Sequence, residues 1–136
     1  METLSLFLQD MQQKYPDGVV RENTCPDASL ENIPLPLKEF YRQYDSIEFP
    51  FGHILPREVA VRNDAEKAYF DRMGWFSFGG DYYFSFWLCR YAPDDEGLWL
   101  TSWDHDVDDE IEGMYADLVA FLKAMEETYA EMEQQM

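Results

Sequence analysis

Apolar side chains recur at helical spacing close to the N-terminus. The repeat over residues 3–15 consists of Leu4, Phe7, Leu8, Met11 and Tyr15. Polar residues fill the intervening positions, so the pattern predicts an amphipathic helix with Thr3 as its N-cap. The turn signal Pro16-Asp17-Gly18 ends it.

A second helical repeat occupies residues 34–45, where Pro34 or Pro36 lies in the first turn and costs no hydrogen bond. Its apolar stripe is Leu37, Phe40, Tyr41 and Tyr44. Val19-Val20 predicts the start of a short strand, and residues 46–51 predict a strand that ends near Pro50. Residues 56–73 are ambiguous, apart from a helical segment that begins at Asp64.

Aromatic residues are dense between Trp75 and Trp103. The nearly continuous apolar run from Tyr82 to Leu88 is typical of a strand covered on both faces. With the segments at 75–78 and 98–103 and the turn residues between them, it predicts an antiparallel meander.

A closing helix is predicted over residues 111–129, with Asp108 or Asp109 as its cap, and residues 131–136 are expected to form a frayed acidic tail. The apolar face of this predicted helix is Ile111, Met114, Tyr115, Leu118, Val119, Leu122, Met125 and Tyr129.

The expected fold is therefore α+β. It is one domain over residues 1–130, with a central antiparallel sheet packed against N-terminal, middle and C-terminal helices.

Negative charge is concentrated in the last third of the chain. The 136 residues carry a formal charge of −18, and residues 91–136 hold 14 of the 28 acidic side chains with one base, Lys123. Nucleic-acid binders and proteins of anionic membrane surfaces need clustered Lys and Arg, so neither partner is expected. The N-terminus lacks the basic and apolar segments of a secretory signal. Two cysteines are too few for a disulfide scaffold, so they are expected to be free thiols in a reducing cytoplasm.

Motifs of catalysis and metal binding do not match. Cys89 lies in an apolar strand pattern, where burial would raise its pKa and make it inert. Asp104, Asp106 and Asp108 occupy positions one, three and five of a calcium loop, but Asp109 and Tyr115 stand where glycine and a bidentate glutamate are required. No catalytic residue, cofactor site or metal site is predicted, although cation binding by residues 104–112 stays open.

Four segments in a consistent order resemble motifs of the SUKH (Smi/Knr-like) superfamily. They are the helix at 33–45 (IPLPLKEFYRQYD), the strand pair at 75–84 (WFSFGGDYYF), the strand at 98–106 that ends in Trp103-Asp104-His105-Asp106, and the helix at 115–122 (YADLVAFL). The likeness covers roughly residues 1–130. Ser46 stands where the family has glycine, and the glycine-rich stretch is reduced to Gly79-Gly80.

The resemblance implies an α+β fold without catalytic residues. Bacterial members are taken to be immunity proteins that neutralise toxins, often nucleases, whereas fungal members are regulatory interaction modules. The expected function is therefore a non-enzymatic, cytoplasmic immunity protein that binds a basic toxin through an acidic surface. A regulatory protein-interaction module is the alternative, a small enzyme or cation-binding protein is a third reading, and homodimerisation is left open.

The predicted binding surface combines acidic residues with tryptophan anchors. Interface hot spots favour tryptophan, and opposite charge accelerates association. Its residues are Asp94, Asp95, Glu96, Trp99, Trp103, Asp104, Asp106, Asp108 and Asp109.

Overall fold

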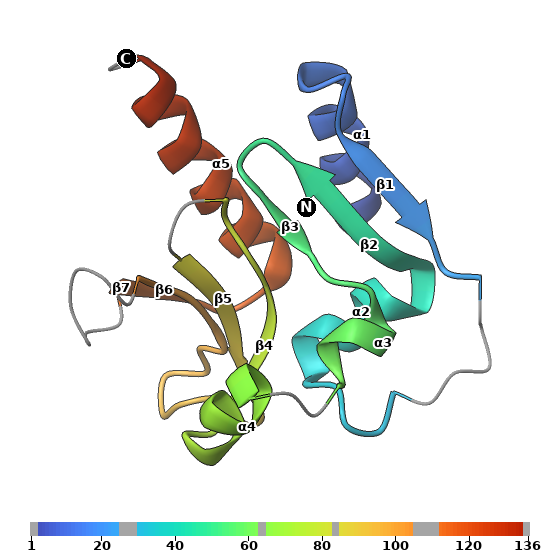
Figure 1. Ribbon diagram of the computed structural model, residues 1–136. Helices are drawn as coiled ribbons and strands as arrows, with labels where there is room; N and C mark the ends of the chain where they lie inside the picture. Colours follow the sequence, from blue (N-terminus) through green and yellow to red (C-terminus); the bar gives the residue numbers. More distant parts are fainter. Residues whose placement is uncertain (1–2, 25–29, 63–64, 83–84, 105–111, 135–136) are drawn as a thin grey trace.

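The strands of the computed structural model form one antiparallel sheet, shown in Figure 1. The structure describes residues 3–24, 30–62, 65–82, 85–104 and 112–134. Each strand pairs with the next in sequence, so the order is β1-β2-β3-β4-β5-β6-β7. The strands are β1 (Val19–Glu22), β2 (Tyr44–Phe49), β3 (Gly52–Ile54), β4 (Trp75–Gly80), β5 (Ser85–Arg90), β6 (Leu100–Asp104) and β7 (Glu112–Tyr115).

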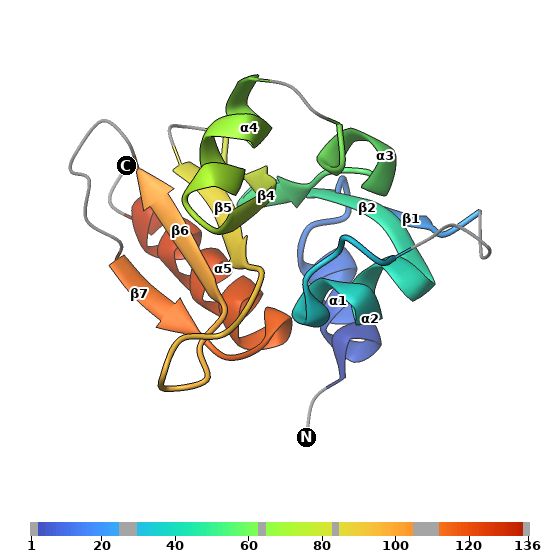
Figure 2. The ribbon, with the colours of Figure 1, turned by 90° about the horizontal axis from the view of Figure 1, so that it is seen from below.

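Helices cover both faces of this sheet. In Figure 2, α1, α2 and α5 lie on one face and α4 lies on the other. The helices are α1 (Leu4–Lys14), α2 (Leu35–Gln43), α3 (Arg57–Ala60), α4 (Ala65–Arg72) and α5 (Leu118–Gln134). The α+β fold class and the central antiparallel sheet are confirmed.

The apolar run at β5 is explained by burial on both sides. Trp87 and Cys89 belong to the larger core cluster, together with Phe121 of α5. Leu88, the residue between them, belongs to a smaller cluster with Phe70 of α4. Because successive side chains of a strand point to opposite faces, a strand between two cores is largely apolar. The strand begins at Ser85, later than the predicted Tyr82, whose side chain is exposed.

Local signals set several helix ends. Thr3 accepts a hydrogen bond from the backbone N–H of Leu6, as expected of the N-cap of α1. Pro36 lies in the first turn of α2, where its missing N–H has no helical partner to lose. The helix predicted to Asp45 is too long, because Tyr44 already pairs with Glu22 as the first residue of β2.

Two consecutive glycines of β4, Gly79 and Gly80, let β3 approach closely. A Cβ atom at Gly79 would lie 2.0 Å from the carbonyl oxygen of His53, so no side chain fits there. His53 pairs with Gly80, and Ile54 pairs with Gly79. The strand β3 itself was missed by the sequence prediction, which placed one strand at 46–51.

The closing helix begins later than predicted. Residues 112–115 form strand β7, in which Tyr115 pairs with Leu100 of β6. The Thr101 hydroxyl donates to the Gly113 carbonyl at 2.7 Å, and Gly113 has φ +60, which L side chains rarely adopt. The predicted start of the closing helix at Ile111 is therefore wrong, because α5 begins at Leu118.

Asp117 is the cap of α5 that the structure describes, since its carboxylate accepts from the N–H of Ala120 at 2.8 Å. The proposed caps Asp108 and Asp109 lie outside the described residues, as does Asp64 before α4. At its other end α5 runs to Gln134 and so includes four residues of the segment expected to fray.

Candidate functional site

The predicted binding residues that the structure describes lie toward the two ends of β6. Asp94, Asp95 and Glu96 are in the β5–β6 loop that precedes the strand, and Asp104 is its last residue. Five residues of strand span about 16 Å, so these acids do not form one continuous cluster. The remaining predicted acids, Asp106, Asp108 and Asp109, lie outside the described residues.

The β5–β6 loop is held in shape by Asp94. Its carboxylate accepts from the N–H groups of Glu96 and Leu98, both at 2.9 Å. Its own N–H donates to the Leu98 carbonyl at 3.1 Å. Asp94 is therefore occupied in an Asx-type turn. The side chains of Asp95 and Glu96 are exposed and present two carboxylates on a fixed loop.

The two predicted tryptophan anchors have different surroundings. Trp103 is half-buried in the smaller cluster, stacked on Phe86 at 6.2 Å and edge-on to Phe70 at 5.6 Å between ring centroids. Trp99 is half-buried against the larger cluster and lines an open groove. Its N–H donates to the Tyr115 carbonyl at 3.0 Å, which fixes its backbone at the junction of β6 and β7.

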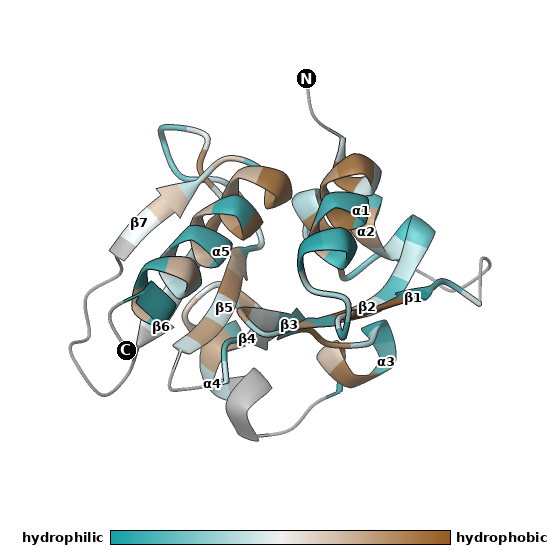
Figure 3. Cartoon of the chain, turned by 90° about the horizontal axis from the view of Figure 1, so that it is seen from above, coloured by the Kyte–Doolittle hydropathy of each residue, from teal (hydrophilic) through white to brown (hydrophobic). Residues whose placement is uncertain are grey.

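This groove, the Trp99 groove, has a volume of about 980 Å³. Its walls are the first turn of α1, the length of α2 and the first two turns of α5. The lining residues are Thr3, Leu4, Ser5, Leu35, Pro36, Glu39, Gln43, Trp99, Ala116, Asp117, Leu118, Val119, Ala120 and Lys123. Figure 3 shows apolar turns of α1 and of the start of α5 near one another, with the hydrophilic β5–β6 loop on the same side of the molecule.

The groove is apolar inside and charged at its margin. Leu35 leaves 63% of its surface exposed there. Among the described lining residues, the charged ones are Glu39, Asp117 and Lys123. Trp99, which lines the groove, follows Glu96 by three positions, so the acidic loop leads into the groove residue Trp99.

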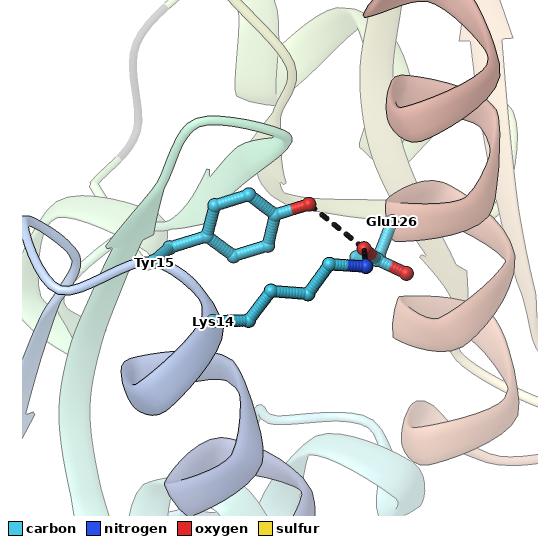
Figure 4. Close-up of polar contacts among 3 residues, drawn as sticks. All are labelled: Lys14, Tyr15 and Glu126. Atoms are coloured by element: carbon cyan, nitrogen blue, oxygen red, sulfur yellow. Dashed lines mark hydrogen bonds and ion pairs between the residues drawn. The ribbon is translucent and has the colours of Figure 1, made fainter. Parts of the chain in front are cut away.

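A buried carboxylate connects α1 to α5. Glu126 of α5 is only 8% exposed, and its Oε1 accepts from the Tyr15 hydroxyl at 2.8 Å and from Lys14 Nζ at 2.5 Å (Figure 4). Both donors lie at the C-terminal end of α1. Burial, followed by the hydrogen bond and charge of Glu126, raises the pKa of Tyr15 well above its ordinary value. We call these three residues the α1–α5 clamp.

The surroundings of Cys89 and His53 shift the pKa values of both side chains. The Cys89 thiol is fully buried, and burial raises its pKa strongly, as its strand pattern predicted. Burial also lowers the pKa of His53, although Glu48 and Asp81 oppose the shift. Across the described residues, no three side chains of the histidine, cysteine or acidic type converge as a metal site would require.

The sequence analysis named Trp99 and the acidic loop as candidates but did not name the apolar walls of the groove. Leu35 was the residue that could have indicated the groove, because it lies outside the apolar stripe of its helix and between two prolines. An apolar residue off the buried stripe indicates an exposed apolar surface. The assembly of three helix starts into one groove depends on long-range packing and had no local signal.

Comparisons with family models, with curated proteins and with solved structures gave no significant match. Among the helices in the described part of the chain, none combines the length and apolar character needed to cross a membrane.

Proposed function

We propose that this chain is a non-enzymatic immunity protein that binds a basic toxin domain and neutralises it by covering its surface. One observation supports this proposal most strongly. A fixed loop with the exposed carboxylates of Asp95 and Glu96 adjoins an open apolar groove that contains Trp99. A binding surface needs an apolar centre and polar margins, and this end of the molecule has both.

The overall charge favours a basic partner. With −18 formal charges on 136 residues, the protein attracts positively charged surfaces over distances near the Debye length, about 8 Å at physiological salt. An enzyme that acts on nucleic acid carries a basic cleft, which such a field complements. Steered association reaches about 10⁸–10⁹ M⁻¹s⁻¹ at low salt, and fast capture protects a cell that already contains the inhibitor.

The test is co-expression with the product of the neighbouring gene, scored by rescue of growth and by co-purification. We expect the wild-type chain to restore growth and Asp95→Lys/Glu96→Lys to lose rescue. The matched control is Glu22→Lys/Glu58→Lys, which changes the charge equally at two exposed positions on β1 and α3, at the far side of the sheet (Figure 1).

A second reversal tests the other end of β6. Asp104→Lys/Asp106→Lys/Asp108→Lys changes the acids that follow the strand, and loss of rescue there alone would move the interface to that end. Co-purification without growth inhibition by the partner would favour the regulatory interaction module. Full rescue by both charge-reversed variants would refute binding through acidic residues.

A further inference from the structure

We propose that the Trp99 groove receives an amphipathic helix of the partner, whose apolar face contacts Leu35, Trp99 and Val119 and whose flanks carry Lys or Arg. This inference rests on the proposed function and names the part of the partner that binds. It follows from the shape of the groove, from the state of its backbone groups and from its charges.

The walls offer side chains and leave little backbone to pair with. The first turn of α1 is capped by Thr3, and the first turn of α5 is capped by Asp117. The first turn of α2 has no side-chain cap, but Pro36 carries no N–H and the Leu37 N–H donates to the Pro34 carbonyl at 3.0 Å. An added strand needs a row of unpaired N–H and C=O groups at a sheet edge, which three helix starts do not supply. A helix satisfies its own backbone internally, so it fits a groove whose contacts come from side chains.

The apolar surface is arranged to contact one helical face. Leu35 belongs to α2, Val119 belongs to α5, and Trp99 is the residue before β6. A helix presents apolar residues at i, i+3, i+4 and i+7 along one stripe, which is how a peptide helix fills a groove between two helices. Tryptophan at the centre of such a contact is a favoured anchor.

The charges around the groove select basic flanks. Glu39 stands on the α2 wall and Asp117 on the α5 wall, and the exposed Asp95 and Glu96 belong to the adjoining loop. Lys123 is the one basic side chain among the described lining residues, and Arg42, outside the lining, lies 3.8 Å from the Glu39 carboxylate. A helix with Lys or Arg on its flanks matches this pattern, whereas an acidic helix meets like charge.

The experiment uses three synthetic peptides and fluorescence anisotropy at about 0.15 M salt. The first peptide has leucines at helical spacing and lysines on its flanks, the second carries two central prolines in the same composition, and the third replaces lysine with glutamate. We expect only the first to bind in the range below about 1 mM. Equal binding of the proline peptide or the glutamate peptide, or no binding of the first, would overturn the proposal.

Variants locate the binding on the protein. Leu35→Ser removes an exposed apolar side chain and is expected to weaken the first peptide about tenfold. The control, Met73→Ser, removes a side chain that is 58% exposed, after α4 on the other face, and should leave affinity unchanged. Lys123→Gln should strengthen binding. Equal effects of Leu35→Ser and Met73→Ser would show nonspecific attraction and refute the site.

The two proposals fail separately. If Leu35→Ser keeps full rescue of growth while Asp95→Lys/Glu96→Lys loses it, the groove is wrong as the helix site and the proposed function stands. If the first peptide binds in the groove but the chain rescues growth from no neighbouring gene product, the immunity function is wrong and the helix site stands.

Discussion

Replacing Glu126 with alanine should loosen the packing of α1 against α5. The carboxylate is 8% exposed and accepts from both Tyr15 and Lys14. Losing an acceptor for a part-buried hydroxyl costs about 1–3 kcal/mol. The Lys14 side chain is 52% exposed and regains water, so its ion pair adds at most about 0.5 kcal/mol.

We therefore expect Glu126→Ala to lower the free energy of unfolding by about 2 kcal/mol, and the melting temperature by roughly 8 °C for a chain of this size. Urea denaturation and differential scanning calorimetry measure both quantities. Glu127→Ala is the matched control, because Glu127 is the exposed neighbour on the same helix and should stay within about 0.5 kcal/mol of wild type. Equal effects of the two substitutions would refute the clamp.

The clamp also predicts a dependence on alkaline pH. Because the pKa of Tyr15 is raised above 10.0, the folded chain keeps a proton that the unfolded chain releases. The contribution of this group is complete below pH 10 and is lost as the pH rises further. Tyr15→Phe should be less stable than wild type at neutral pH and should lose less of its stability above pH 10. Parallel pH profiles for the two proteins would contradict this assignment.

Three further results follow from the packing and the pKa shifts. Gly79→Ala should lower the free energy of unfolding by about 3 kcal/mol or prevent folding, because the new Cβ meets the His53 carbonyl. Gly97→Ala is the control, in open space at φ +79, and should cost about 1 kcal/mol in urea denaturation. A stable Gly79→Ala protein would contradict the close approach of β3 to β4. Because burial lowers the pKa of His53, the contribution of this group to stability should be complete above pH 6.5 and fall below it. His53→Gln should flatten that part of the pH profile, and an unchanged profile would contradict the burial of the imidazole. In a Cys25→Ser background, a thiol reagent should modify Cys89 slowly in the folded protein and rapidly in denaturant, and rapid native labelling would contradict its burial.

Prediction from sequence succeeded where one pattern had one structural meaning. The nearly continuous apolar run before Leu88 predicted a strand covered on both faces, and β5 does lie between two core clusters, although it begins at Ser85 and not at Tyr82. The N-terminal helix was equally clear, since its repeat and its cap at Thr3 agree. Both features are fixed by residues close in sequence.

The start of the closing helix was mispredicted because its pattern fits two structures. Met114 packs on the smaller cluster and Tyr115 on the larger one, which are the opposite faces of a strand. The same two positions continue a helical stripe when read from the sequence alone. Pairing with β6 decided between them, through Leu100 and Thr101, and this contact has no local signature.

The candidate site was predictable in its chemistry and not in its shape. Asp95, Glu96 and Trp99 are neighbours in sequence, so their charge and aromatic character were evident. The groove beside them joins residues 3–5, 35–43 and 116–123, which only the tertiary fold brings together. Leu35, off the stripe of its helix, was the one local indication of that surface.

The salt dependence of association with the neighbouring gene product tests the central claim most directly. Stopped-flow rates at rising salt should fall steeply for the wild type and less steeply for Asp95→Lys/Glu96→Lys, with the control Glu22→Lys/Glu58→Lys close to the wild type. A rate that is independent of salt, or equal slopes for the loop variant and the control, would contradict recognition of a basic partner at this end of the molecule.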